Sequence, residues 1–256
     1  MNNAFLQSKP LPLKFFRVVS CFSLFKKNSS VTSFTDALHY GLKGLIMNQV
    51  ALLKNQYLAI RKQLPWLDAW QAPQTSAVFP DAPDSTVPAV PILPLHRETK
   101  LSKNTLAWFR PEVMSLSDAA TLTEGRCPLI VKATDVKLDV LDQFVGQHPG
   151  LILIFASGDR KILYDYAGLV ELLKKHSGFF LCTANLCNML ALERMQQEGL
   201  AGKLLYGSFM PFLAEDSSMA PLILSNLSWQ DKCAIAGNNL RKILGLSAEF
   251  PPEIQY

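Results

Sequence analysis

Short apolar runs alternate with amphipathic segments through the second half of the chain. The apolar runs occupy residues 127–133, 151–157, 179–183 and 204–208. Between and after them, apolar side chains recur at helical spacing in residues 138–147, 167–176 and 189–198 and in two further stretches up to Leu246. Buried parallel strands read as continuous apolar runs, and the helices that cover them read as amphipathic. The pattern therefore predicts a parallel sheet with helices on its outer face.

The first half of the chain shows a less regular pattern of the same kind. Further strand-like runs lie at residues 17–25, 44–50, 90–96 and 106–110. Helices are predicted at residues 34–40, ending at Gly41, and at residues 51–64, ending at Pro65. Residues 65–88 are rich in proline and polar residues. They are expected to form a long loop within one domain, with a linker between two domains as the alternative.

Together these runs predict an α/β protein of the (β/α)8 class, a TIM-like barrel, regular or distorted. About eight strand-like runs are present, the number that a closed barrel of parallel strands requires. An open doubly wound sheet is the alternative, but no glycine-rich phosphate loop follows any strand. The expected organisation is a loose leader at residues 1–14, a single barrel domain at residues 15–248 and a C-terminal tail at residues 249–256.

Composition and charge exclude several classes. Hydrophobic residues make up 49% of the 256 residues and charged residues 18%, which argues against whole-chain disorder. The 25 basic and 21 acidic residues leave a net charge of +4 without a basic cluster, so nucleic acid is not an expected partner. The five cysteines are scattered, and none forms a CxxC pair, which argues against a zinc knuckle and a disulfide framework. Reduced thiols in a cytoplasmic protein are the expectation.

No membrane segment is expected either. The longest apolar stretch, residues 150–157, is about half of the ~20 residues that cross a bilayer. Residues 18–21 (VVSC) resemble a lipoprotein cleavage site, but Arg17 interrupts the apolar region that a signal peptide needs before it.

Several motifs in this order resemble those of the amidohydrolase-related proteins, which are metal-dependent TIM-barrel hydrolases and decarboxylases. Residues 204–211 (LLYGSFMP) resemble the family's lLfGSDfP segment, and residues 227–246 resemble its closing helix. Four weaker matches are residues 18–24 to iDvHaHl, 107–111 to gvKlhP, 128–132 to lPvliH and 149–158 to fPglkvvlaHaGg. The resemblance runs from about Val18 to Leu246, and it implies the barrel fold.

The departures from the family pattern bear on function. Cys21 and Ser23 stand where the family has two metal-binding histidines, and Lys132, Phe155 and Phe209 stand at three further ligand positions. Zinc sites need about three ligands from histidine, cysteine or carboxylate, and phenylalanine supplies none. The resemblance with these losses implies no bound metal and no other cofactor. It also implies a metal-independent pseudoenzyme, or one with diverged catalysis, that acts as a binding or regulatory module.

Another chemistry can replace the lost site. Lys132, at the end of an inner strand, can form a Schiff base with a carbonyl compound, or its ammonium can pair with Asp159, Asp135 or Glu112. Cys21 can act as a nucleophile with His96 as its base, or it can be a buried structural cysteine.

Arg110 can hold a carboxylate, or it can form an ion pair at the rim of the barrel. The alternative function is thus a hydrolase or lyase that acts on a small carboxylate or carbonyl compound. The expected partner is a small molecule, with a homodimer as a further option.

Overall fold

The structure is a computed structural model that describes residues 32–71, 85–156, 166–186 and 190–253, with side chains from residue 46 onward. The chain divides into two compact units, Met1–Lys54 and Asn55–Tyr256. All strands of the described part belong to the second unit. The predicted leader and the predicted strand at residues 17–25 lie outside the described residues.

A single helix, α2 (Thr32–Gln63), takes the place of three predicted elements. The predicted strand at residues 44–50 and the helix end at Gly41 are both wrong. The apolar side chains of the supposed strand, Ile46 and Val50, continue to Leu53 at the i, i+4, i+7 spacing of one helix face. A glycine inside a helix costs only about 1 kcal/mol, so Gly41 does not end α2.

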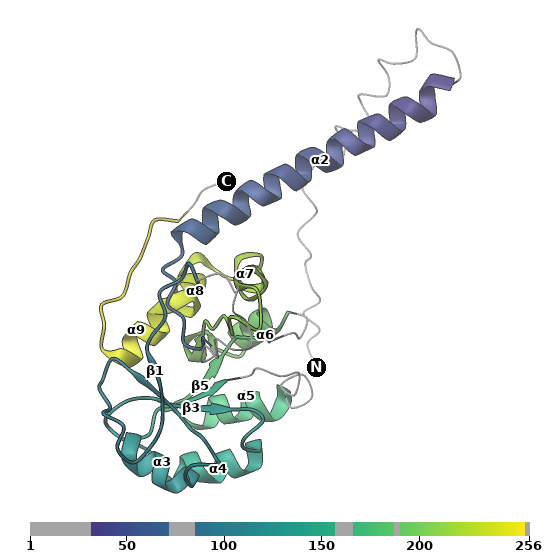
Figure 1. Ribbon diagram of the computed structural model, residues 1–256. Coiled ribbons are helices and arrows are strands. Elements are labelled where there is room, and N and C mark those ends of the chain that lie inside the picture. The colour runs from purple at the N-terminus through teal and green to yellow at the C-terminus, as the bar shows by residue number, and fades with distance from the viewer. Residues whose placement is uncertain (1–31, 72–84, 157–165, 187–189, 254–256) are drawn as a thin grey trace, which may run out of the picture. The chain divides into compact units, whose positions relative to one another are not determined.

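Six parallel strands form one sheet in the order β1-β2-β3-β4-β5-β6 (Figure 1). Each strand lies within one of the predicted apolar runs. The strands are β1 (Ile92–Pro94), β2 (Leu106–Trp108), β3 (Leu129–Lys132), β4 (Leu153–Ala156), β5 (Phe179–Cys182) and β6 (Leu204–Leu205). A doubly wound sheet reverses its strand order at one point, whereas a barrel keeps the order of the chain. The predicted α/β class with parallel strands and outer helices is confirmed, and the strand order is that of a barrel.

A short extended segment, residues 67–70, lies between the two ends of this sheet. On one side, the Asp68 amide donates to the Pro88 carbonyl at 2.9 Å, next to the start of β1. On the other side, the Ala69 amide donates to the Tyr206 carbonyl at 2.9 Å, just after β6. The six strands and this segment therefore form a closed, distorted ring.

The closing segment corrects the prediction of one long loop at residues 65–88. Its four residues are all buried, and only residues 72–84 of the predicted loop lie outside the described part of the chain. The segment escaped prediction because it is short and prolines stand close by on both sides, at Pro65 and Pro73. Short pairing segments give little periodicity to detect.

The C-terminal helices hold the closing segment in place. They are α8 (Trp229–Cys233), the π-helical turn η5 (Ala234–Asn238) and α9 (Asn239–Leu244). The carbonyl of Ile235 accepts the Tyr206 amide at 2.9 Å, and the carbonyl of Ala236 accepts the Leu67 amide at 2.9 Å. A side chain at Gly237 would lie 2.1 Å from the Pro65 carbonyl oxygen, so glycine permits this close approach. The π-helical turn therefore ties the closing segment to β6.

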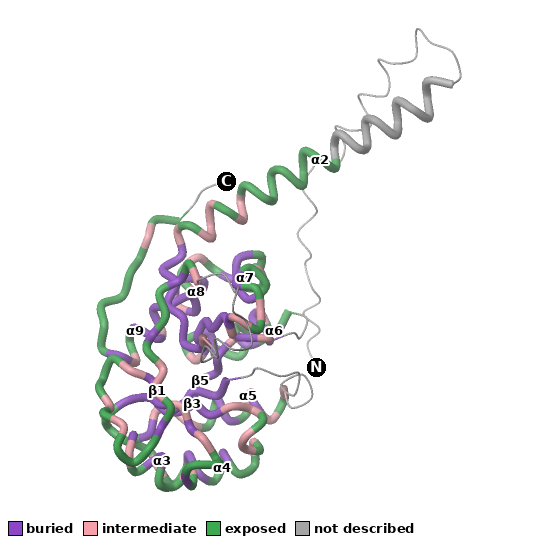
Figure 2. The backbone as a smooth tube through the Cα atoms, in the orientation of Figure 1, coloured by how far each residue is buried: buried purple, intermediate pink, exposed green. Residues whose placement is uncertain are grey.

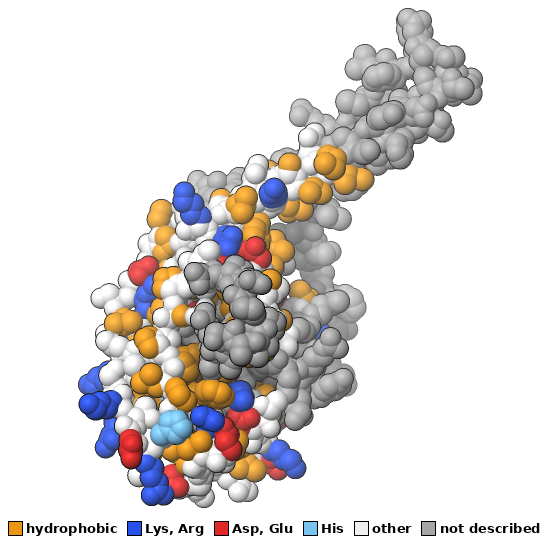
Figure 3. Space-filling model, in the orientation of Figure 1, with side chains coloured by type: hydrophobic (Ala, Val, Ile, Leu, Met, Phe, Trp, Pro, Cys, Tyr) orange, Lys and Arg blue, Asp and Glu red, His pale blue; other side chains and the backbone are white. Residues whose placement is uncertain are grey.

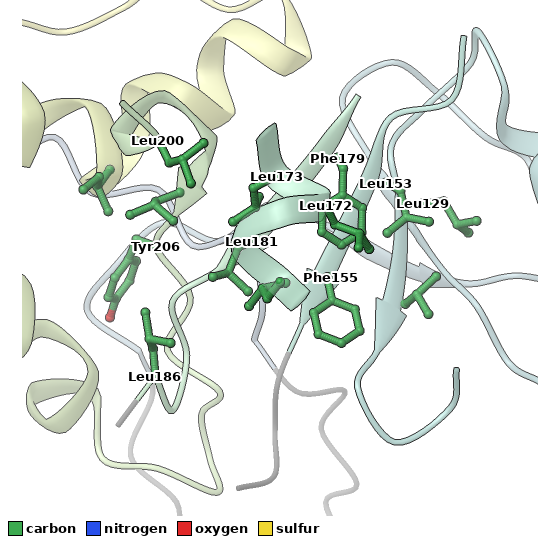
Figure 4. Packing of buried hydrophobic residues seen from close by; sticks show 14 of the residues in the cluster. Leu129, Leu153, Phe155, Leu172, Leu173, Phe179, Leu181, Leu186, Leu200 and Tyr206 are labelled. Carbon is green, nitrogen blue, oxygen red and sulfur yellow. The ribbon is translucent and has the colours of Figure 1, made fainter. Parts of the chain in front are cut away.

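The hydrophobic core has an outer and an inner layer. In the outer layer, Leu172 and Leu173 of α5 pack over strand residues such as Leu153, Phe179 and Leu181 (Figure 4). The helices of this layer include α3 (Leu116–Thr123), α4 (Leu138–Gln147), α5 (Tyr166–Lys175), α6 (Ala191–Gln197) and α7 (Glu215–Ile223). The inner layer fills the ring with the alternate strand residues, including Leu106, Ile130, Ile154 and Leu205. Strands β3, β4 and β5 are buried on both faces, whereas α3 and α4 keep an exposed face (Figure 2).

No helix in the described part of the chain combines the length and apolarity that crossing a membrane requires.

Candidate functional site

Successive side chains along a strand point to opposite faces of the sheet, and this alternation determines which of them face the barrel mouth. In β3, Leu129 and Val131 join the outer layer, whereas Ile130 joins the inner layer. Lys132 therefore points to the interior at the carboxyl end of its strand. In β2, Trp108 packs against the inner layer in the same way. Barrel active sites form at this end of the strands, so these side chains define the candidate site.

Lys132 has a carboxylate partner and an aromatic neighbour. Its Nζ lies 3.7 Å from Oδ1 of Asp135 and 4.9 Å from the centre of the Trp108 ring. The Lys132 side chain is 31% exposed and the Asp135 side chain 10%. Of the three partners expected for Lys132, the structure brings Asp135 to it, while Asp159 lies outside the described residues. A cation over an indole face is stabilised by about 0.5–2 kcal/mol.

Aromatic rings form one wall of the mouth. Trp70, at the end of the closing segment, meets Trp108 edge-on with ring centres 6.1 Å apart. It stacks on Phe209 with centres 6.2 Å apart and an interplanar angle of 10°. Phe209 stacks in turn on Phe212 at 5.1 Å. Phe209 thus lies at the mouth, as expected for its position after β6.

Three buried polar atoms near the mouth have no hydrogen-bond partner among the residues that the structure describes. They are Nε1 of Trp70, Nε1 of Trp108 and Oδ2 of Asp135. A buried unpaired polar group costs about 1–3 kcal/mol, and such groups are rare in folded proteins. Two donors, a cation and one acceptor therefore come together at the same end of the barrel. This set suits a small ligand that carries an anionic group and a hydrogen-bond donor.

Arg110 lies on the rim and forms the ion pair that was one of its two expected roles. Its Nε lies 2.7 Å from Oε1 of Glu112, and its guanidinium carbon is 5.9 Å from the centre of the Trp108 ring. The pKa of Glu112 is lowered by its own backbone amide and by the hydrogen bond from Arg110. Both side chains are largely in solvent, so this pair contributes little to stability.

A buried carboxylate beneath the mouth positions the aromatic wall. Asp68 is fully buried, and its carboxylate accepts the Trp70 amide at 2.8 Å. Ser208 donates to it twice, from its amide at 3.1 Å and from its hydroxyl at 2.5 Å. Burial raises the pKa of Asp68 to about 6, although these hydrogen bonds oppose the shift. Asp68 and Ser208 together join the closing segment to the loop that carries Phe209.

Other predicted site residues lie elsewhere. Phe155 joins the outer layer and packs against Phe179 with ring centres 6.0 Å apart, so it faces the helices and not the mouth. This placement corrects the expectation that Phe155 stands at a ligand position of the site. The reason is the strand period, which turns Ala156 inward instead. Cys21 and Ser23 lie outside the described residues.

The histidines are mostly distant from the mouth. His96 follows β1 and is exposed, so it is at the expected strand end but on the surface. His148 and His176 lie at the ends of α4 and α5, where His176 Nε2 is 2.7 Å from Oδ1 of Asp142. His39 lies within α2.

Glu215, at the start of α7, is a buried carboxylate. It is 8% exposed, and its carboxylate accepts the Ser85 hydroxyl at 2.6 Å and the Thr86 amide at 3.0 Å. The Val87 amide donates at 3.3 Å, Arg61 Nη2 at 3.1 Å, and the Thr86 hydroxyl donates as well. Burial alone would raise the pKa of Glu215, but these hydrogen bonds outweigh it and hold the pKa below its usual value. Glu215 therefore fixes the segment that leads into β1.

The described mouth residues do not fit a metal. No group of three or more histidine, cysteine or carboxylate side chains in the described part of the chain is arranged to hold an ion. Asp135 is a single carboxylate, and Trp70, Lys132 and Phe209 are not the ligands that zinc or manganese takes.

Comparisons with known proteins concern the fold. Neither a scan of protein-family models nor a search of curated proteins gives a match. An uncharacterized TIM-barrel protein from Bordetella bronchiseptica is 14% identical with a TM-score of 0.49, over 66% of this chain and 69% of that one. A probable 2-pyrone-4,6-dicarboxylic acid hydrolase from Acinetobacter baumannii is 12% identical with a TM-score of 0.45, over 67% and 76%.

A third similar structure is amidohydrolase 2 from Bifidobacterium longum subsp. infantis, 13% identical with a TM-score of 0.41, over 58% of this chain and 66% of that one. These TM-scores lie below 0.5, so the barrel assignment rests on the strand order and the closing segment. The three similar structures are thus a TIM-barrel protein, a probable hydrolase and an amidohydrolase.

Proposed function

We propose that the barrel mouth binds a small carboxylate and that the protein acts as a ligand-binding module, either non-catalytic or diverged in its catalysis. The observation that carries this proposal is the pair of buried indole N–H groups of Trp70 and Trp108, which have no partner among the described residues, with the Lys132 ammonium over the Trp108 ring. A carboxylate supplies two acceptor oxygens and a negative charge, and charge-assisted hydrogen bonds are the strongest of their kind.

The aromatic wall sets the size and character of the ligand. Trp70, Trp108 and Phe209 offer apolar ring surface next to the polar donors. Small-molecule sites are commonly built in this way, from apolar walls and a few placed polar groups. The unpartnered Oδ2 of Asp135 adds an acceptor, so the ligand is expected to carry a hydroxyl or amino group near its carboxylate.

Calorimetric titration with succinate and benzoate tests the proposal. The variant Lys132→Gln removes the charge and keeps the length of the side chain. Lys174→Gln is the matched control because Lys174 pairs with Glu198 at the surface of α5. We expect the first variant to weaken binding about tenfold or more, since a hydrogen bond to a charged group contributes about 1.5–3 kcal/mol, and the control to leave it unchanged. Equal affinities for both variants would refute the assigned role of Lys132.

The pair of Lys132 and Asp135 favours a second candidate, a lyase or hydrolase that acts on a carbonyl compound. In its free-amine form Lys132 attacks the carbonyl carbon and forms a C=N bond, and both amine protons pass to the carbonyl oxygen, which leaves as water. Oδ2 of Asp135, whose Oδ1 lies 3.7 Å from Nζ, is suited to take a proton from the amine and return it to that oxygen.

Reductive trapping distinguishes this second candidate from the first. Pyruvate and sodium borohydride are added, and the Lys132 peptide is examined by mass spectrometry. A reduced adduct on Lys132 that is lost in Lys132→Gln supports the enzyme. An unmodified peptide, together with normal carboxylate binding, leaves the binding module as the function.

A further inference from the structure

A second cavity lies at the opposite end of the barrel from the mouth. It has a volume of about 310 Å³ and opens at the amino ends of the strands. Its walls come from the residues before β2, β3 and β4 and from the end of α9, whose Ile243 and Leu244 plug the inner layer. The cavity is thus separate from the proposed carboxylate site, which is at the carboxyl ends of the strands.

Three basic side chains from three different segments line this cavity. They are Lys103, Arg126 and Lys242, all three exposed to solvent, and no acidic residue of the described part of the chain lines the cavity with them. Among the described residues, none of the three forms an ion pair. Solvent screens the repulsion between these like charges, and an anion bound between them removes what remains of it.

At two positions in the cavity wall, a glycine leaves the main chain without a side chain over it. A side chain at Gly125 or Gly245 would meet no atom within 4 Å, so open space faces the chain at both positions. Both glycines have positive φ, 70° and 71°, and each ends a helix region, after α3 and α9. Side chains larger than hydrogen are disfavoured there, which keeps the walls of the cavity open.

The positions of two of the three basic residues are explained by helix C-termini, but the position of Lys103 is not. Arg126 follows the C-terminus of α3 and Lys242 lies in the last turn of α9, where a cation interacts favourably with the helix dipole. Lys103 lies in the loop before β2, which no helix precedes, and it meets the other two at one cavity. The nearest acidic group, Glu124, is turned to the Gly150 amide at 3.1 Å and to His148 at 3.7 Å.

We infer that this cavity binds a small multiply charged anion of the phosphate type, such as a phosphate ester or pyrophosphate. Three cations suit a ligand of charge −2 or more better than a monocarboxylate, because each additional charge adds an electrostatic contact. The volume suits a small molecule and excludes a folded macromolecule.

Calorimetric titration of the full chain with pyrophosphate at low ionic strength tests the inference. We expect one site per chain, with affinity reduced about tenfold or more in Arg126→Gln and in Lys242→Gln. Lys62→Gln, at an exposed lysine of α2 outside the cavity, is the matched control and is expected to bind like the wild type. No binding at millimolar pyrophosphate, or equal affinity in all three variants, would overturn the inference.

Amide resonances locate the anion independently of affinity. Pyrophosphate is expected to shift the amide signals of Gly125, Gly150 and Gly245, and to leave the indole signals of Trp70 and Trp108 in place. The reverse pattern would assign the anion to the mouth and contradict a second site. Because the two sites use different residues, failure here leaves the proposed function standing.

Discussion

Glu215 offers the sharpest test of how the barrel is held together. Its carboxylate accepts the amides of Thr86 and Val87, the hydroxyls of Ser85 and Thr86, and one nitrogen of Arg61. The variant Glu215→Ala removes the acceptor of the Thr86 amide and of two hydroxyls, whereas the Val87 amide keeps Oγ of Ser85 as an acceptor at 3.2 Å. Each lost hydrogen bond costs about 0.5–1.5 kcal/mol, so three of them cost about 3 kcal/mol. The Arg61 contribution is discounted because its side chain is 27% exposed.

The expected loss for Glu215→Ala is therefore about 3 kcal/mol in the free energy of unfolding. Glu215→Gln keeps one acceptor oxygen for Ser85 and the amides, and loses the charge that faces Arg61. Its expected loss is smaller, about 1–2 kcal/mol. Asp216→Ala is the control, because the neighbouring Asp216 also contacts Arg61, at 3.2 Å, but is 61% exposed. It is expected to cost less than about 1 kcal/mol.

Urea unfolding at pH 7, followed by circular dichroism, measures all three variants. The low pKa of Glu215 also means that its contribution is present at neutral pH and is lost as the pH falls through the folded-state pKa. Wild type should thus lose stability on acidification more steeply than Glu215→Gln. A loss below about 0.5 kcal/mol for Glu215→Ala would refute the role assigned to this carboxylate.

Two further predictions concern the closing segment and the strand that it joins. In Gly207→Ala the added carbon would lie 2.2 Å from Sγ of Cys182 and 3.1 Å from Cβ of Trp70. The free energy of unfolding is therefore expected to fall by about 1–3 kcal/mol, measured by thermal unfolding. An unchanged Tm would contradict this close packing. The pKa of Asp68 is raised to about 6 from an unfolded value of about 3.9, so the stability it contributes is full below about pH 4 and is lost as the pH rises through 6. Relative to wild type, D68N should gain about 2 kcal/mol between pH 4 and pH 7 in urea unfolding, and a parallel pH dependence for both proteins would refute this.

The sequence predicted the second half of the fold well. The helix expected at residues 138–147 is α4, because Leu141, Phe144 and Val145 repeat at helical spacing and are buried together. The strand predicted at residues 44–50 was wrong because an apolar run of that length is compatible with either a strand or one face of a helix. The closing segment was missed because its evidence is a set of hydrogen bonds to β6 and to the start of β1, which no local pattern reports.

The site was predictable only in part. Lys132 was identified because a lysine at the end of an apolar run points into a barrel mouth. Phe155 was placed wrongly because the motif match ignored the alternation of inward and outward residues along β4. The indole groups of Trp70 and Trp108 were not recognised, since the lack of a hydrogen-bond partner is a property of the folded chain.

The four tryptophans allow the most direct test of the carboxylate site. Nε1 of Trp66 donates to the Arg61 carbonyl at 2.7 Å and Nε1 of Trp229 to the Pro251 carbonyl at 2.9 Å, whereas those of Trp70 and Trp108 have no acceptor among the residues described. The indole N–H signals can be followed by nitrogen-15 correlated NMR during a succinate titration, with the signals of Trp66 and Trp229 as internal controls. The account predicts that the Trp70 and Trp108 signals move downfield with saturation while the Trp66 and Trp229 signals stay. Stationary Trp70 and Trp108 signals at saturating succinate, or equal movement of all four, would contradict it.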